Sequence, residues 1–310
     1  MKIILAKPRG FCAGVTRAIE SVEKAIAKFG PPVYVRHEIV HNKFVVESLR
    51  KKGAIFVSEV DQIPVGAITI FSAHGVSDKV EEDAAKRGLD VIDATCPLVS
   101  KVHREAKKYE EEDYEIILIG HRGHPEVAGT SGRVKKDVIL VTSEEDARNV
   151  EIKNSAKIAY VTQTTLSVDD TKKIAEILEK RFPQMQQGLA TKDICYATQN
   201  RQDAVRSLIK MVDVLLVIGA QNSSNSNRLR DLGEECRLKS YLINGAADVE
   251  PHWFVGVENI GLTAGASAPE ILVQEVVEKI REIANADVPV SDMNGIVENT
   301  FFALPRKVRK

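Results

Sequence analysis

Three of the four cysteines in this sequence share one local setting. Cys12, Cys96 and Cys195 each stand directly before a segment in which apolar residues recur at three- and four-residue steps. A thiolate at the start of a helix is stabilised by the positive end of the helix dipole and by free backbone N–H groups. The setting favours a metal ligand or a nucleophile. For a single cysteine, a small buried apolar residue is the simpler interpretation, but recurrence in three places favours the chemical one.

The spacing of these cysteines excludes the compact metal-binding motifs. They lie 84 and 99 residues apart, whereas zinc ribbons and ferredoxins place their ligands as Cys-x2-Cys pairs. Ligands this distant meet only if three parts of the chain converge on one point. Three thiolates on a four-iron cluster would leave one iron without a protein ligand, and that iron could bind a substrate oxygen. Cys236 falls inside an amphipathic segment, residues 226–238, and we expect it to be structural.

Polar residues follow the apolar runs that we expect to form strands. Five runs end in clusters rich in His, Ser, Thr, Asn and Gly, which are residues 72–75, 120–126, 162–165, 219–227 and 264–267. Open parallel sheets bind ligands outside the carboxyl ends of their strands, so we expect one shared pocket. Hydroxyls, amides, imidazoles and helix N-termini together suit a phosphate or a diphosphate. For Asn222–Asn227, simple capping of the following helix is the alternative.

Histidines and one glutamate supply candidate donors and acids. Four histidines lie near strand-end turns, where they either donate to phosphate or satisfy turn backbone: His41, His74, His121 and His124. Pro125 at a first helical position would place Glu126 in the first turn. There Glu126 either stabilises the helix dipole or, in a sheltered pocket, delivers a proton as a general acid. Thr164 and Thr165 could relay that proton or hold a substrate hydroxyl.

Composition narrows the possible partners and locations. Lys plus Arg (43) and Asp plus Glu (44) nearly cancel in 310 residues, so no global positive field attracts nucleic acid or an anionic membrane. The segment before Lys7 is too short for the apolar core of a signal peptide, and the longest apolar runs have strand length. We therefore expect a cytoplasmic protein without structural disulfides. We also expect its source to be a prokaryote.

Alternating strand and helix patterns predict an α/β fold with mostly parallel sheets. The expected strands are residues 2–6, 67–71, 115–119, 157–161, 214–218 and 259–263. The expected helices are residues 15–28, 98–109, 198–209 and 272–283. Because each cysteine setting recurs after the length of one small α/β unit, we predict three such units. They are residues 1–96, with Cys12 and Cys96 towards its ends, 97–194, and 195–284, which starts at Cys195. Residues 285–310 are expected to be a C-terminal tail, solvated over 305–310.

Nine motifs in this chain resemble those of the 4-hydroxy-3-methylbut-2-enyl diphosphate reductases. They occur in order and are far longer than chance matches, and the resemblance runs from the first strand to about Pro305. They are Pro8–Val15, His37–Asn42, Ser72–Val76, Asp93–Pro97, Gly120–Glu126, Thr162–Ser167, Ile194–Thr198, Asn222–Arg228 and Thr263–Pro269.

The resemblance implies the last step of the non-mevalonate isoprenoid pathway. Members of this family reductively remove the allylic hydroxyl of (E)-4-hydroxy-3-methylbut-2-enyl diphosphate, which yields isopentenyl diphosphate, dimethylallyl diphosphate and water. The implied cofactor is one 4Fe-4S cluster with three cysteine ligands and one open iron. The implied fold is three pseudo-symmetric units around this central cluster, and the implied electron donor is a ferredoxin or a flavodoxin.

The resemblance also implies roles for individual residues. The cluster ligands would be Cys12, Cys96 and Cys195. Glu126 would be the acid, and Thr164 would bind and position the substrate hydroxyl. The implied diphosphate contacts are His41, His74, His124, Ser223, Ser224, Asn225 and Ser267.

Two functions of other classes remain open from the residues alone. A zinc- or phosphate-binding module built from the same cysteines and histidines would purify with zinc and without iron–sulfur absorption. A three-cysteine 4Fe-4S hydro-lyase or synthase acting on a small phosphorylated substrate would be active without any reductant.

Overall fold

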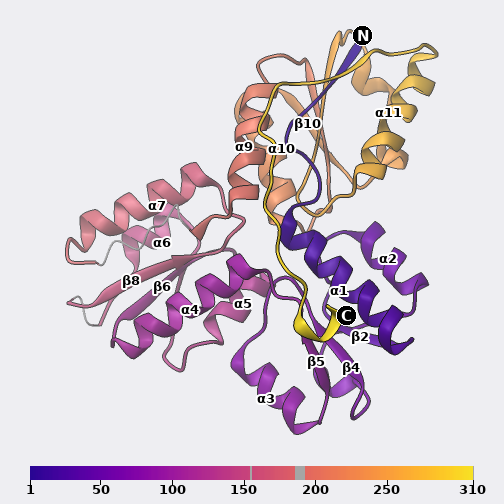
Figure 1. Ribbon diagram of the computed structural model, residues 1–310. Helices are drawn as coiled ribbons and strands as arrows, with labels where there is room; N and C mark the ends of the chain where they lie inside the picture. The colour runs from indigo at the N-terminus through magenta and orange to yellow at the C-terminus, as the bar shows by residue number, and fades with distance from the viewer. Residues whose placement is uncertain (154–155, 186–192, 310) are drawn as a thin grey trace. The chain divides into compact units, whose positions relative to one another are not determined.

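The computed structural model describes residues 1–153, 156–185 and 193–309 (Figure 1). By its internal contacts the chain forms two compact units. Unit 1 comprises Met1–Thr16, His41–Glu47 and Tyr196–Phe301. Unit 2 comprises Arg17–Val40, Ser48–Cys195 and Phe302–Lys310. Each unit therefore combines stretches that lie far apart in the sequence.

Unit 1 is built on a five-stranded parallel sheet with the strand order β10-β9-β11-β1-β12. The strands are β1 (Lys2–Leu5), β9 (Val214–Ile218), β10 (Lys239–Ile243), β11 (Asn259–Ala264) and β12 (Val290–Asp292). All five residues of β9 are buried. A strand that is apolar along its whole length is typical of a parallel sheet covered by helices on both faces.

Helices cover the two faces of this sheet. Helix α11 (Glu270–Ala284) packs on one face, and α9 (Tyr196–Leu208) and α10 (Ser224–Glu235) pack on the other (Figure 1). Ile3 packs with α11, whereas Ile4 packs with α9 and α10, because successive side chains of a strand point to opposite faces. Two 3-10 turns, η2 (Ala246–Asp248) and η3 (Pro251–Phe254), complete the unit. Helices α1 (Ala13–Phe29) and α2 (Lys43–Lys51) begin in unit 1 and continue in unit 2.

Unit 2 holds two smaller parallel sheets, with the strand orders β3-β2-β4-β5 and β7-β6-β8. The strands of the first are β2 (Val33–Arg36), β3 (Ala54–Val57), β4 (Ile68–Phe71) and β5 (Asp90–Asp93). Those of the second are β6 (Glu115–Ile119), β7 (Ile139–Val141) and β8 (Ile158–Thr162).

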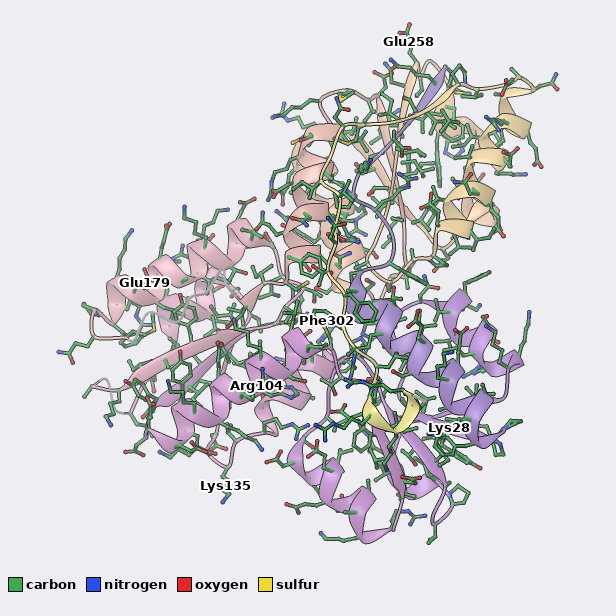
Figure 2. The ribbon with its side chains drawn as sticks, viewed as in Figure 1. Lys28, Arg104, Lys135, Glu179, Glu258 and Phe302 are labelled. Atoms are coloured by element: carbon green, nitrogen blue, oxygen red, sulfur yellow. The ribbon has the colours of Figure 1, made fainter. Side chains whose placement is uncertain are left out.

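Both faces of the β6–β8 sheet are covered in the same way as those of the unit 1 sheet. Helices α6 (Glu144–Asn149) and α7 (Val168–Arg181) pack on one face, and α4 (Pro97–Glu111) and α5 (Pro125–Ser131) pack on the other. Helix α3 (Asp78–Lys86) packs against β4 of the four-stranded sheet. The unit also contains the turns η1 (Val60–Gln62) and η4 (Arg306–Val308). Charged side chains such as Lys135 in unit 2 and Glu258 in unit 1 project away from the sheets (Figure 2).

The prediction of an α/β fold with small parallel sheets is confirmed, since every strand pair in the described part of the chain is parallel. The six expected strands correspond to β1, β4, β6, β8, β9 and β11, each within one residue at either end. The other six strands were not predicted. Five of them have only three or four residues, but so do the predicted β1 and β4, so length alone did not decide which strands were found. The pseudo-symmetric arrangement around a common centre stays a prediction.

The predicted division into residues 1–96, 97–194, 195–284 and 285–310 also stays a prediction, but two strands pair outside their predicted segments. Strand β1 pairs with β11, and β12, from the expected tail, pairs with β1. The expectation that residues 305–310 are solvated is wrong for Val308, which is 3% exposed. Its burial and the ion pair between Lys307 and Asp90 hold this segment in unit 2.

Cys236 differs from the sequence prediction. Helix α10 ends at Glu235, so Cys236 is the C-cap residue and is exposed rather than inside the helix. The next residue, Arg237, has a left-handed backbone with φ of 60°, which stops the helix. No helix among the described residues combines the length and the apolar character that a membrane crossing requires.

Candidate active site

Glu126 is a buried carboxyl group in the first turn of α5, with 3% of its surface exposed. The backbone N–H of Thr164 donates to Glu126 Oε1 at 2.6 Å, and the Thr164 hydroxyl donates to Oε2 at 3.0 Å. Burial raises the pKa of Glu126 to about 7, against the opposing effect of the Thr164 hydrogen bonds, and the charge of Asp193 adds to the rise. A carboxyl group with this pKa can hold a proton near neutral pH and release it.

His124 adjoins Glu126, and His74 adjoins His124. His124 is the N-cap residue of α5, and its Nδ1 accepts a hydrogen bond from the backbone N–H of Glu126 at 3.1 Å. A neutral His124 therefore carries its proton on Nε2, where it can donate to a ligand. The rings of His74 and His124 meet edge to face with centroids 5.8 Å apart. His74 Nδ1 lies 3.2 Å from the Ser72 hydroxyl.

Cys96 is the N-cap residue of α4, and Pro97 opens the helix. Its backbone N–H donates to the Ala73 carbonyl at 3.0 Å, directly beside His74. Asp93 Oδ1 accepts hydrogen bonds from the N–H and the hydroxyl of Thr95, at 2.9 and 2.5 Å. These contacts hold the turn that presents the Cys96 thiol at the start of the helix.

Cys195 is tied to the same group of residues through Thr164. The backbone N–H of Cys195 donates to the Thr164 carbonyl at 3.0 Å. Contacts therefore run without interruption from the Cys96 loop to Cys195, and we name the residues that they join the Glu126 cluster. Its members are Cys96, His74, His124, Glu126, Thr164 and Cys195.

Asp193 holds the segment that leads to Cys195. One of its carboxylate oxygens accepts from the Thr162 N–H at 3.3 Å, and the other pairs with Lys101 of α4 at 3.2 Å. Burial and the neighbouring Glu105 raise the pKa of Asp193 to about 7, while Lys101 opposes this rise. The segment before Cys195 is thereby attached both to β8 and to the helix that starts at Cys96.

In unit 1, Cys12 lies between β1 and α1, near the carboxyl ends of neighbouring strands. Its backbone N–H donates to the Ala266 carbonyl at 3.3 Å, next to Ser267. The Ser267 hydroxyl donates to the His41 carbonyl at 2.9 Å, and the Asn222 amide nitrogen lies 3.3 Å from His41 Nδ1. The structure therefore brings Cys12, Ser267 and His41 together with the start of α10.

The start of α10 contains an amide group that is buried and unsatisfied. Ser223 is the N-cap residue, and its hydroxyl accepts from the Ser226 N–H at 3.3 Å. Asn225 is 4% exposed, and neither its Oδ1 nor its Nδ2 has a hydrogen-bond partner within the described residues. Buried side-chain amides are nearly always bonded, so this one is available to a ligand. Together with the N–H groups at a helix start, it suits an anion.

The predicted site residues thus fall into two groups, one in each unit. The Glu126 cluster belongs to unit 2. The second group, which we name the Cys12 cluster, belongs to unit 1 and contains Cys12, His41, Ser223, Ser224, Asn225 and Ser267. In the parts of the chain that the structure describes, no three His, Cys, Asp or Glu side chains are grouped as in a metal site.

Two sequence candidates lie outside both groups, and several residues with important contacts were not expected. His121 is exposed, and the Thr165 hydroxyl accepts from the Gln163 amide at 2.8 Å. Sequence analysis did not single out Asp193 or the buried Arg201, which holds the loop before Cys12. For Arg201 the available signal was positional, because a basic residue follows each of the three cysteines by five or six residues.

The chain is similar to a known family over most of its length. The family model described as LytB protein matches residues 3–281. The 4-hydroxy-3-methylbut-2-enyl diphosphate reductase 2 of Bradyrhizobium diazoefficiens is 56% identical over 308 residues, which are 99% of each chain. The 4-hydroxy-3-methylbut-2-enyl diphosphate reductase of Azoarcus sp. is 54% identical over 309 residues, covering 100% of this chain and 98% of the relative.

Two solved structures of enzymes with corresponding names are also similar to this chain. The E-1-hydroxy-2-methyl-but-2-enyl-4-diphosphate reductase from Plasmodium falciparum matches with a TM-score of 0.93 at 38% sequence identity, covering 99% of this chain and 96% of that one. A structure described as (E)-4-hydroxy-3-methyl-but-2-enyl diphosphate reductase, the terminal enzyme of the non-mevalonate pathway, matches with a TM-score of 0.64 at 34% identity. It covers 91% of this chain and 100% of that one.

Proposed function

Because the chain belongs to the LytB protein family, we propose that it reductively removes the allylic hydroxyl of (E)-4-hydroxy-3-methylbut-2-enyl diphosphate. The products are isopentenyl diphosphate, dimethylallyl diphosphate and water. The reaction breaks one C–O bond, forms one C–H bond, and consumes two electrons and two protons. Relatives that match over nearly their full length are named as reductases of this diphosphate.

The observation that carries the proposal is the environment of Glu126. This carboxyl group is sheltered, has a pKa of about 7, and is hydrogen-bonded to Thr164, whose carbonyl accepts from Cys195. Loss of a hydroxyl as water requires a proton at the leaving oxygen, and a sheltered acid near neutrality is suited to deliver it. Glu126 is therefore the proposed acid, and the Thr164 hydroxyl holds the substrate hydroxyl and passes on the proton.

We propose one 4Fe-4S cluster held by Cys12, Cys96 and Cys195, with one iron lacking a protein ligand. The donor set fits such a cluster, because each of the three thiols is half-buried at the start of a helix and no disulfide forms among the described residues. When bound, the cluster supplies electrons and a Lewis-acidic iron. The proposed electron donor is a ferredoxin or a flavodoxin, and thiols that must stay reduced favour a cytoplasmic location.

The proposed diphosphate contacts are neutral or weakly basic groups. The Nε2–H of His124 and the neighbouring His74 supply ring donors in unit 2. The unsatisfied amide of Asn225 and the start of α10 supply donors in unit 1. The remaining proposed contacts are His41, Ser223, Ser224 and Ser267. Binding the diphosphate orients the distant hydroxyl for reaction.

The test is anaerobic iron and sulfide analysis, followed by turnover with and without a one-electron reductant. Cys12→Ser, Cys96→Ser and Cys195→Ser are each expected to lose or weaken the cluster, whereas the exposed Cys236→Ser is the matched control and is expected to keep it. Stoichiometric zinc without iron–sulfur absorption, or activity without a reductant, would reject the proposed function in favour of another class.

A further inference from the structure

Each of the three helices that follow a proposed ligand cysteine carries a cation in its second turn. Arg17 is the fifth residue of α1, Lys101 is the fifth residue of α4, and Arg201 is the sixth residue of α9. All three side chains contact the loop that leads to another of the three cysteines, and each of these contacts lies within one unit.

Arg17 holds the turn before Cys96. Its Nη1 donates to the Thr95 carbonyl at 2.9 Å, and its Nη2 donates to the Asp93 carbonyl at 3.3 Å. Its Nε donates to the carbonyl of Ala303 in the C-terminal segment at 2.9 Å. Burial lowers the pKa of Arg17, and the nearby charges of Asp93 and Cys96 act against this lowering. The guanidinium group is therefore a partly buried positive charge close to a proposed ligand thiol.

Lys101 makes the corresponding contact with the segment that precedes Cys195. Its Nζ pairs with Asp193 at 3.2 Å, and Asp193 also accepts from the Thr162 N–H. One carboxylate thus joins the helix that begins at Cys96, the end of β8, and the segment two residues before Cys195.

Arg201 holds the loop before Cys12 and is 1% exposed. Its Nε and Nη2 donate to the Gly10 carbonyl at 3.0 and 2.7 Å, and Nη2 also lies 3.3 Å from the Phe11 carbonyl. Glu298 pairs with its Nη1 at 3.0 Å. A buried cation is tolerated only where its charge is paired and its N–H groups are bonded. Its Nε and Nη2 are thus directed at the two residues before the thiol, while its Nη1 also donates to the Ala197 carbonyl.

We propose that Arg17, Lys101 and Arg201 are positioning residues for the iron–sulfur cluster. Their contacts form a cycle, since the helix after Cys12 holds the loop before Cys96, the helix after Cys96 holds the loop before Cys195, and the helix after Cys195 holds the loop before Cys12. Each loop is thereby set against the helix of another ligand, which orients the thiols before the cluster is built. This inference rests on the proposed function, because it presupposes the cluster.

Neutral and conservative variants test the inference in the anaerobically reconstituted holoprotein. The neutral variants are Arg17→Gln, Lys101→Met and Arg201→Gln, and the conservative ones are Arg17→Lys, Lys101→Arg and Arg201→Lys. The matched control is Arg87→Gln, because Arg87 also donates to a carbonyl, that of Ile63 at 2.6 Å. Ile63 precedes β4 and Arg87 precedes β5, so this contact lies at the amino ends of the strands and not in a loop that leads to a cysteine. The measurements are the rate of iron release to a chelator, the midpoint potential of the cluster, and the Tm of the apoprotein.

We expect each neutral variant to release iron about 10- to 100-fold faster than the unsubstituted protein, with partial rescue in the conservative variants. Arg17→Gln should also lower the midpoint potential, because a positive charge near a cluster favours its reduced state. The Arg87→Gln control should match the unsubstituted protein in both measurements. If Arg201→Gln does not fold, the more exposed Lys101→Met and the Arg17 variants carry the test.

Unchanged iron release and potential in the Arg17 and Lys101 variants would overturn the inference while leaving the proposed function intact. The inference would also be overturned if iron release increased only in proportion to the fall in apoprotein Tm and Arg87→Gln showed the same increase. The residues would then be merely structural. If the unsubstituted protein itself takes up no iron and sulfide, the proposed function fails and the inference with it.

Discussion

Thr164 contacts both oxygens of the Glu126 carboxyl group, through its backbone N–H at 2.6 Å and through its hydroxyl at 3.0 Å. The N–H group can only donate, so Glu126 Oε1 is held as an acceptor. A proton on Glu126 is therefore carried by Oε2, the oxygen that faces the Thr164 hydroxyl. That hydroxyl can accept this proton while donating its own to a ligand. The pair thus defines one direction in which a proton leaves the buried acid.

Replacing the acid should abolish most turnover without dismantling the site. Glu126→Gln keeps an oxygen for the Thr164 N–H but has no proton to release near neutral pH. We expect turnover to fall about 10²- to 10⁴-fold, with iron content and diphosphate affinity close to those of the unsubstituted protein. The control is Glu176→Gln, which changes an exposed carboxyl on α7. Full activity of Glu126→Gln in a steady-state assay would assign the proton to another group.

Removing the Thr164 hydroxyl should move the pH profile in a defined direction. Thr164→Val keeps the backbone N–H but loses the hydrogen bond that stabilises the charged carboxylate, and this bond lowers the pKa of Glu126. We expect the pH at which turnover declines on the alkaline side to rise, and the maximal rate to fall. Thr164→Ser should restore both. An alkaline limb at the same pH in all three proteins would contradict the proposed contact.

The buried acid should also make the apoprotein less stable as pH rises. The pKa of Glu126 rises from 4.5 to about 7 on folding, so the folded state binds more protons than the unfolded state between these values. The free energy of unfolding therefore falls as pH increases through this window and stays lower above it. Glu126→Gln removes this titration. Between pH 5 and pH 8 the free energy of unfolding should therefore fall by about 2–3 kcal/mol less in this variant than in the unsubstituted apoprotein. Urea titrations at each pH measure this difference.

Asp193, whose pKa is also about 7, is present in both of these proteins, so the difference between their curves reports the titration of Glu126 together with its coupling to Asp193. Parallel curves for the two proteins would show that the carboxyl group is not held in a desolvated state.

The unsatisfied amide of Asn225 should matter for ligand affinity more than for stability. Asn225→Ala removes a buried group that has no hydrogen-bond partner in the described part of the chain. We expect a small change in Tm but about a 10- to 100-fold loss of affinity for inorganic diphosphate, measured by calorimetry. Asn244→Ala, which changes an amide bonded to Asp248, is the control. Equal affinity in all three proteins would remove Asn225 from the proposed site.

The sequence by itself determined the local elements and the chemistry of the site residues. Strand–helix alternation predicted six strands to within one residue at either end, because short uninterrupted runs of apolar and β-branched residues mark buried strands. Cys96 and Cys195 could be placed before helices from sequence, since helical periodicity follows each of them and Pro97 opens the first of these helices. The pattern around Cys236 misled, because periodicity does not show where α10 ends when a non-glycine residue adopts a left-handed backbone.

Which residues meet was decided only by the tertiary structure. Strand β1 pairs with β11, more than 250 positions later, and this pairing depends on strand order, which local periodicity does not encode. Likewise, the local sequence does not distinguish Arg201 from an ordinary exposed basic residue of a helix. Its burial against Gly10 follows from the packing of α9. The raised pKa of Glu126 has the same origin, because desolvation is a property of the packed fold and not of a motif.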